Sequence, residues 1–128
     1  MEHKEELIKY RLERCKSAIE EAKISIDMNK LHLAENRIYY AIYYVVSALS
    51  LKNDYSTSKH SSLQGWFNKN FVNTGIISKE LGKIYSNAFE NRQESDYEDM
   101  VEFEIDDVKK DYENMLLFVE NIENLISK

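Results

Sequence analysis

The chain has 128 residues, with no proline, three glycines, one cysteine and a formal net charge of −6. So little turn-forming material disfavours a many-stranded β fold, and the length fits one domain over residues 1–128. A hydrophobic fraction of 43% excludes a disordered chain, and the acidic balance argues against a surface that neutralises many phosphates, though not against a local basic pocket. The lone cysteine, the polar first residues and the lack of a long apolar run predict a cytoplasmic protein without a membrane span.

Two periodic segments lie at the ends of the chain. Apolar residues recur every three or four positions over residues 3–27 and 104–127, which predicts two long amphipathic helices. Residues 31–52 are apolar on nearly every side and include tyrosines at 39, 40, 43 and 44. This segment is predicted to be a buried or shared helix, with Asn29 as its N-cap.

Two further helices are expected in the middle of the chain. Residues 63–71 predict a short helix, and Ser78 is predicted to cap a fourth long helix that ends near Gln93, before an acidic connection over 94–102. Gly82 costs this helix about 1 kcal/mol relative to alanine, so we expect a close helix contact there. The sequence therefore predicts an all-α fold, an up-and-down bundle of four long helices plus one short helix.

Arg37 stands out because its predicted helix face otherwise carries small residues. A buried guanidinium needs a carboxylate, so we interpret Arg37 as half of a structural ion pair. The expected partners are Glu90, Glu94 and Asp96. If the pair is buried, Arg37→Ala should cost about 3–5 kcal/mol. A functional role for this charge is the alternative.

Arg92 and Asp96 are four residues apart, so they face each other if the fourth helix continues that far. A helix-end ion pair is the simplest interpretation. The four tyrosines favour a core or dimer interface over a base-stacking surface, because no lysine or arginine is interleaved with them in the sequence.

The three histidines are isolated from one another and from the cysteine. We therefore assign no metal site. The glycine-rich loops that bind nucleotide phosphates or cofactors are absent from the sequence, so no cofactor is expected.

The segments 34–43, 60–61, 67–76 and 90–99 carry a further signal when they are taken together. In this order they resemble a small stand-alone branch of the HEPN (higher eukaryotes and prokaryotes nucleotide-binding) domain family. The resemblance covers nearly the whole chain. It implies a helical bundle that commonly forms a homodimer, often with a neighbouring minimal nucleotidyltransferase that acts as antitoxin to a HEPN toxin.

The resemblance also implies a chemistry, because many members of the family are metal-independent ribonucleases. In those proteins an arginine is followed after four to six residues by a histidine that transfers the proton, and two protomers join these motifs across a cleft. After Arg92 the corresponding positions hold Tyr97, Glu98 and Asp99. A tyrosine of pKa near 10 is a poor base at pH 7, so only the anion-binding half of the motif is kept.

The leading hypothesis is a HEPN-like protein of a toxin–antitoxin-type system, which dimerises through its tyrosine-rich helix and fourth helix. It would bind a nucleotide, an RNA end or a protein partner in a cleft near Arg92. Asp96 would orient Arg92 or Arg37. The expected ligand-binding residues share this cleft: Arg92, Asp96, Tyr97, Lys59 and His60.

Two alternatives stay open. In the first, the protein is a metal-independent ribonuclease in which His60 replaces the missing histidine and acts with Arg92. In the second, it is a non-catalytic helical interaction module.

Overall fold

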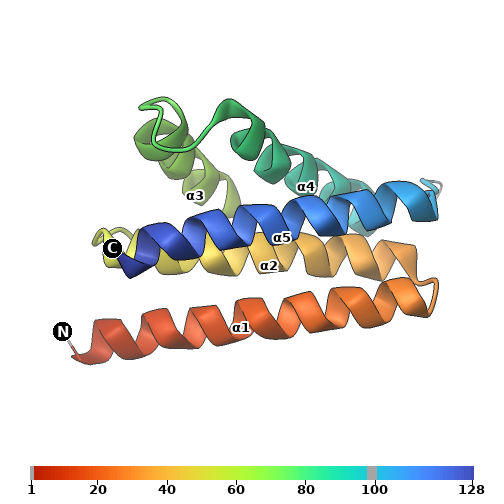
Figure 1. The fold of residues 1–128 in the computed structure, drawn as a ribbon, viewed down its shortest axis with the longest axis horizontal. Helices are drawn as coiled ribbons and strands as arrows, with labels where there is room; N and C mark the ends of the chain where they lie inside the picture. The colour runs from red at the N-terminus through yellow and green to blue at the C-terminus, as the bar shows by residue number, and fades with distance from the viewer. Residues whose placement is uncertain (1, 98–100) are drawn as a thin grey trace.

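The computed structural model describes residues 2–97 and 101–128, apart from the side chains of residues 2, 95 and 97. Its helices are α1 (Glu2–Asp27), α2 (Leu31–Lys52), α3 (His60–Phe67), α4 (Lys79–Tyr97) and α5 (Ile105–Ser127), and a π-helical turn, η1 (Asn68–Val72), continues α3. The described residues form helices and connecting turns only (Figure 1). The predicted all-α bundle of four long helices and one short helix is confirmed.

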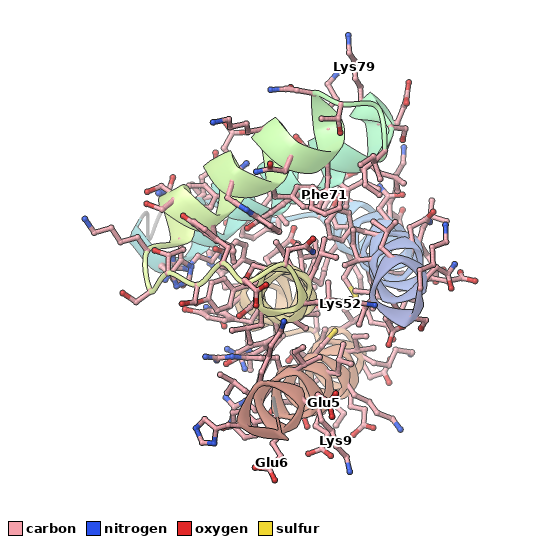
Figure 2. All side chains as sticks on the ribbon, turned by 90° about the vertical axis from the view of Figure 1, so that its left-hand side faces the viewer. Glu5, Glu6, Lys9, Lys52, Phe71 and Lys79 are labelled. Atoms are coloured by element: carbon pink, nitrogen blue, oxygen red, sulfur yellow. The ribbon has the colours of Figure 1, made fainter. Side chains whose placement is uncertain are left out.

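Helix α2 lies at the centre of the bundle. It packs against α1, α4 and α5, and it also contacts α3. The view along the bundle shows α1 on one side of α2, α3 and α4 on the opposite side, and α5 beside α2 (Figure 2). A helix enclosed in this way must be apolar on several faces, which is the pattern of residues 31–52.

The core is built around the buried face of α2. Fully buried side chains come from every long helix, among them Cys15, Ile38, Ile42, Tyr85, Met115, Phe118 and Ile122. Cys15 is free, and burial raises the pKa of its thiol to about 12. No helix in the described part of the chain has the length and apolar character needed to cross a membrane.

The ends of α2 are fixed by backbone and lysine contacts. Asn29 has a φ of 57°, and the bonds from Asn29 N to Ile26 O (2.9 Å) and from Lys30 N to Ser25 O (2.8 Å) close α1 in a Schellman motif. The prediction that Asn29 caps α2 is therefore wrong, because Lys30 occupies the N-cap position. At the other end Lys52 donates to the C-terminal carbonyl groups of α5, where a cation also meets the negative end of the helix dipole (Figure 2).

Helix α4 begins as expected and ends later. The Leu81 amide donates to Ser78 Oγ at 3.2 Å, which confirms the predicted cap. The expected end near Gln93 is wrong, because the helix continues to Tyr97. The added turn carries an i,i+4 ion pair between Arg92 and Asp96, and it has no glycine or proline to interrupt it.

Gly82 makes the close contact that its place in α4 predicts. A Cβ atom there would lie 3.0 Å from Val72 Cγ2 and 3.2 Å from Val72 Cγ1. The π-helical turn that ends at Val72 therefore packs directly on the α4 backbone.

Candidate functional site

Four tyrosines of α2 form a continuous row of rings, here called the tyrosine row: Tyr39, Tyr40, Tyr43 and Tyr44. Neighbouring centroids lie 5.3 Å apart for Tyr39 and Tyr40, 5.9 Å for Tyr40 and Tyr43, and 5.6 Å for Tyr43 and Tyr44. All three pairs meet edge to face, which is a favourable arrangement for aromatic rings. Tyr39 is fully buried, whereas the other three are partly exposed. The row therefore runs from the core to the surface.

Three guanidinium groups from three different helices lie over this row. The Cζ atom of Arg14, on α1, is 5.2 Å from the centre of the Tyr44 ring. The Cζ atoms of Arg37, on α2, and Arg92, on α4, are 5.1 Å and 5.6 Å from the Tyr40 ring. All three distances are within the range of cation–π attraction. Together with the tyrosine row these arginines form a basic aromatic patch on an acidic protein.

The sequence reveals only part of this patch, because Arg37 is three residues before Tyr40 on one helix, whereas Arg14 and Arg92 are far from the tyrosines along the chain. For Arg14 the sequence gives one signal, a spacing of three residues from Arg11 on one helix. That spacing does not indicate which helix the two arginines face. No basic residue is interleaved with the tyrosines in the sequence, but in the folded protein three arginines lie over their rings.

His60 begins α3 and packs on the same row. Its ring is stacked on Tyr43, with centroids 4.3 Å apart and an interplanar angle of 9°. Its Nδ1 atom and the Tyr39 hydroxyl are hydrogen-bonded at 2.6 Å. Burial lowers the pKa of His60, and the positive charge of Arg92 lowers it further. The imidazole is therefore predominantly neutral near pH 7.

The structure brings His60 and Arg92 together on two shared rings. The His60 centroid lies 5.6 Å from Tyr39 and 5.8 Å from Tyr40, and Arg92 Cζ lies 5.5 Å and 5.6 Å from the same rings. These two residues are 32 positions apart in the chain, and they come from α3 and α4. A neutral imidazole and a guanidinium thus meet at one place, which is the pair of groups that proton transfer beside a phosphate requires.

The Arg92 guanidinium makes an ion pair and a hydrogen bond with residues of the same chain. Its Nε atom is 2.9 Å from Asp96 Oδ2, and its Nη2 atom donates to the Tyr40 hydroxyl at 3.4 Å. The side chain is 18% exposed. A phosphate that reaches this guanidinium must therefore compete with the Asp96 carboxylate.

Arg37 forms an ion pair with a different partner from those expected. Its Nη1 atom is 3.1 Å from Glu21 Oε1 on α1, and its Nε and Nη2 atoms donate to Asn36 Oδ1 at 3.0 Å and 2.7 Å. The prediction of Glu90, Glu94 or Asp96 as the partner is wrong, because Arg37 turns toward α1 and not toward α4. The pair is also partly exposed, at 24% for Arg37 and 54% for Glu21.

Asp96 is connected to the Arg37 side of the patch through Asn36. Asn36 Nδ2 donates to Asp96 Oδ1 at 3.4 Å, while Asn36 Oδ1 accepts from Arg37. One carboxylate thus contacts Arg92 directly and Arg37 through an amide.

For two of the expected ligand-binding residues, Lys59 and Tyr97, the structure gives no contact with the tyrosine row among the described residues. Lys59 is exposed beside His60, and its amide donates to Thr57 Oγ1 at 3.1 Å. Tyr97 ends α4, and its side chain lies outside the part of the chain that the structure describes. Lys59 is therefore the one of the two that can be placed, at the rim of the patch.

A buried carboxyl of α2 that lies outside the basic aromatic patch was not expected from the sequence. Glu35 is 1% exposed, and Asn91 Nδ2 donates to its Oε2 atom at 3.4 Å and to Asp111 Oδ2 at 3.2 Å. Glutamate next to alanine on a tyrosine-rich helix gives no sign of this burial. Only the packing of α4 and α5 creates it.

Comparison with known proteins places this geometry in a family. The sequence model of the HEPN domain matches residues 8–128. A protein of Thermotoga maritima called "UPF0332 protein" is 44% identical over 126 residues, which is 98% of this chain and 96% of that protein. Two Methanocaldococcus jannaschii proteins are also similar over shorter stretches. "Putative toxin MJ0142" is 35% identical over 81 residues (63% of this chain and 52% of its own), and "Putative toxin MJ0605" is 34% identical over 61 residues (48% and 46%).

The helical bundle and its basic aromatic patch thus define an all-α domain with a candidate anion site. The chain belongs to the HEPN family. Some of its relatives carry names that describe them as toxins, and the chain matches about half the length of each of those two proteins.

Proposed function

We propose that the basic aromatic patch binds a phosphate-bearing ligand, a nucleotide or an RNA end, and that the protein is a HEPN component of a toxin–antitoxin-type system. The supporting observation is that Arg14, Arg37 and Arg92 lie on one row of tyrosine rings. Partly exposed rings give bases a surface on which to stack, and guanidinium groups bind phosphate with charge-assisted hydrogen bonds. The toxin names of two relatives support the biological context.

The test is a binding titration of Arg92→Ala. Fluorescence anisotropy with a labelled oligoribonucleotide, and with a labelled adenine nucleotide, should show a loss of about tenfold or more, because a hydrogen bond to a charged group contributes about 1.5–3 kcal/mol. Lys79→Ala, which removes an exposed charge at the start of α4, is the matched control and should bind as the wild type does. Equal affinity of Arg92→Ala and wild type would remove Arg92 from the site.

The variant Asp96→Asn provides an independent test of the same site. Asp96 competes with a phosphate for Arg92, so its neutral isostere should raise the affinity for the oligoribonucleotide. A lower affinity would mean that Asp96 acts mainly by orienting Arg92.

A second candidate function, ribonuclease activity without a metal, is supported by the convergence of His60 and Arg92 on the same rings. In this reaction His60 accepts the proton of a ribose 2′-hydroxyl, whose oxygen then attacks the neighbouring phosphorus. The bond from phosphorus to the 5′-oxygen breaks, the leaving 5′-oxygen takes a proton from the His60 imidazolium or from water, and Arg92 stabilises the charge on the phosphate oxygens. The lowered pKa of His60 keeps the imidazole in the basic form that the first step needs.

Cleavage would be measured on an oligoribonucleotide in the presence of EDTA. The expected products carry cyclic phosphate or 3′-phosphate ends, and His60→Ala should abolish their formation while still binding the oligoribonucleotide. If purified wild-type protein at micromolar concentration leaves the RNA intact, the protein binds without cutting.

The partner proposals concern a second copy of the chain and a nucleotidyltransferase antitoxin. A dimer formed through the side of the molecule that carries the patch would bring two Arg92 residues toward one cleft. Light scattering should then give twice the mass of 15.2 kDa. Dimer mass without affinity for either labelled ligand would instead favour an interaction module, and a neighbouring reading frame for a nucleotidyltransferase would support the paired system.

A further inference from the structure

A pocket beside the tyrosine row, here called the Arg11 pocket, lies between α1, α2 and the loop that precedes α3. Its lining residues are Leu7 and Arg11 of α1, Tyr43, Ser47 and Leu51 of α2, and Ser56, Thr57 and Ser58 of the loop. The residues from each helix are spaced by four, so each helix presents one face to the same space. Because Tyr43 also belongs to the tyrosine row, the pocket is continuous with the basic aromatic patch.

The lining of the Arg11 pocket combines one positive charge with several hydroxyl groups. Besides Arg11, its polar side chains are the phenol of Tyr43 and the hydroxyls of one serine on α2 and three loop residues. No carboxylate is among the lining residues that the structure describes. Guanidinium and hydroxyl groups are the side chains that commonly donate hydrogen bonds to phosphate oxygens. The pocket therefore has the composition of an anion site on an acidic protein.

Arg11 differs from the three arginines of the patch in its lack of a protein partner. Arg14 donates to the Tyr44 hydroxyl, and Arg37 and Arg92 form ion pairs. The Nε atom of Arg11 is buried without a hydrogen-bond partner, and no ion pair joins Arg11 to the described residues. A partly buried guanidinium without a partner is costly, and an anion beside it would offset that cost. The residue as a whole is partly exposed, so an anion in the pocket can reach its terminal Nη groups.

Two hydroxyl groups of the lining can donate to the same anion. Ser47 accepts a hydrogen bond from Ser50 through its backbone carbonyl, and no described residue bonds its hydroxyl. Thr57 Oγ1 accepts from the Lys59 amide at 3.1 Å, so the hydroxyl hydrogen still has to be donated elsewhere. One hydroxyl comes from α2 and the other from the loop, which places donors on two walls of the pocket.

Arg92 and Arg11 mark two different positions along the tyrosine row. Arg92 Cζ lies 5.5 Å and 5.6 Å from the centres of Tyr39 and Tyr40. Arg11 lines its pocket with Tyr43, and its charge opposes the rise in the pKa of that phenol that burial causes. The centroids of Tyr40 and Tyr43 are 5.9 Å apart. The two positions therefore suit two phosphate groups joined through a ribose better than a single phosphate.

We propose that the Arg11 pocket binds a second phosphate of the ligand, so that the ligand of the patch is a strand of at least two nucleotides and not a mononucleotide. Arg11 binds this phosphate, and Ser47 and Thr57 donate to it. The pocket volume of about 380 Å³ lies within the range of about 300–1,000 Å³ that is usual for small-ligand sites, so the attached ribose also fits. This inference rests on the proposed function, to which it adds a phosphate contact.

The test compares two ligands that differ in one phosphate. Both are fluorescent diribonucleotides with 2′-O-methyl riboses, which prevent cleavage, and one of them also carries a 5′-phosphate. In anisotropy titrations the wild-type full chain should bind the ligand with two phosphates about tenfold or more tightly, because charge-assisted hydrogen bonds are strong. Arg11→Ala should lose this preference. Lys16→Ala, which removes an exposed charge of α1 outside the pocket, is the matched control and should keep it.

The failure of this inference differs from the failure of the proposed function. If Arg92→Ala weakens the binding of both ligands and Arg11→Ala weakens neither, the Arg11 pocket is not a phosphate site and the proposed function stands. If the wild type binds neither ligand, the proposed function fails, and inorganic phosphate then tests the pocket alone. Millimolar sodium phosphate should raise the melting temperatures of wild type and Arg92→Ala above those in NaCl of equal ionic strength, but not that of Arg11→Ala. In that case, an equal rise in all three proteins, or in none, would overturn the inference.

Ser47→Ala serves as a second variant if Arg11→Ala does not fold. It removes one hydroxyl from a helix and leaves the charge of the pocket unchanged. Its affinity for the ligand with two phosphates should fall about threefold or more, and its affinity for the ligand with one phosphate should stay the same. Equal losses for both ligands, or no loss for either, would contradict the assignment of the second phosphate to this pocket.

Discussion

Arg37 shows how exposure decides the energy of a single ion pair. Its partner Glu21 is 54% exposed, and Arg37 itself is 24% exposed, so solvent screens their attraction. The pair spans two helices, but it does not carry the cost of an isolated buried charge. The loss of about 3–5 kcal/mol that is expected for a buried pair therefore does not apply to Arg37.

We predict that Arg37→Ala lowers the free energy of unfolding by about 1 kcal/mol or less, which is the usual range for an exposed pair. Urea denaturation followed by circular dichroism measures this change, and Glu21→Gln should give a loss of similar size. A loss of about 3 kcal/mol or more would indicate a pair that is shielded from water.

At the residue scale the sequence predicts contacts within a helix and misses contacts between helices. The Arg92–Asp96 pair follows from its i,i+4 spacing, and the structure contains it at 2.9 Å. The Arg37–Glu21 pair and the stacking of His60 on Tyr43 depend on how α1 and α3 pack against α2. No spacing along the chain encodes those distances.

At the element scale the two helical glycines form a natural comparison. Gly65 lies exposed in α3, and a Cβ atom there would meet nothing within 4 Å. Gly82 is buried in α4 against both methyl groups of Val72. The same substitution therefore removes the same backbone freedom at both sites and adds crowding at only one.

We predict that Gly65→Ala stabilises the protein by up to about 1 kcal/mol, the difference in helix propensity between glycine and alanine. Gly82→Ala should be less stable than Gly65→Ala by about 1 kcal/mol or more, because the added methyl group forces Val72 to move. Denaturation in urea measures both. In a Val72→Ala background the difference should largely disappear, and a difference that persists would show that Val72 is not its cause.

Helix periodicity predicts the elements well and their ends less well. The long amphipathic segments and the short third helix are found where apolar spacing places them. The last turn of α4 carries charged side chains, so apolar spacing gives no sign of it. Asn29 is ambiguous because asparagine is favoured both before a helix and in the left-handed turn that ends one.

At the scale of the whole molecule, charge is distributed unevenly around α2. The chain has a net charge of −6, yet three arginines gather on the tyrosine row. The carboxyl groups of Glu35 and Asp111 lie with amides in a separate cavity. Total charge therefore describes neither site, and an argument from composition can exclude an extended basic surface but not a local one.

The central position of α2 was predictable, and the two surfaces that it supports were not. A helix that is apolar on nearly every side must be enclosed by others. The basic aromatic patch arises because α1, α3 and α4 each contribute a side chain to it, and the cavity arises because α4 and α5 meet α2 at polar residues.

Nearby positions on α2 and on α4 contribute to two places of opposite charge, the carboxyl cavity and the basic aromatic patch. On α4, Asn91 holds the carboxyl pair and the next residue, Arg92, lies on the rings; on α2 the corresponding residues are Glu35 and Arg37, two positions apart. Asn91 and Arg92 belong to one rigid helix, so a rotation of α4 about its axis that moved Asn91 relative to the carboxyl groups would turn the Arg92 guanidinium relative to the tyrosines by the same angle. Rotation of one rigid helix would therefore couple the carboxyl cavity to the arginine patch, without any loop or hinge in between.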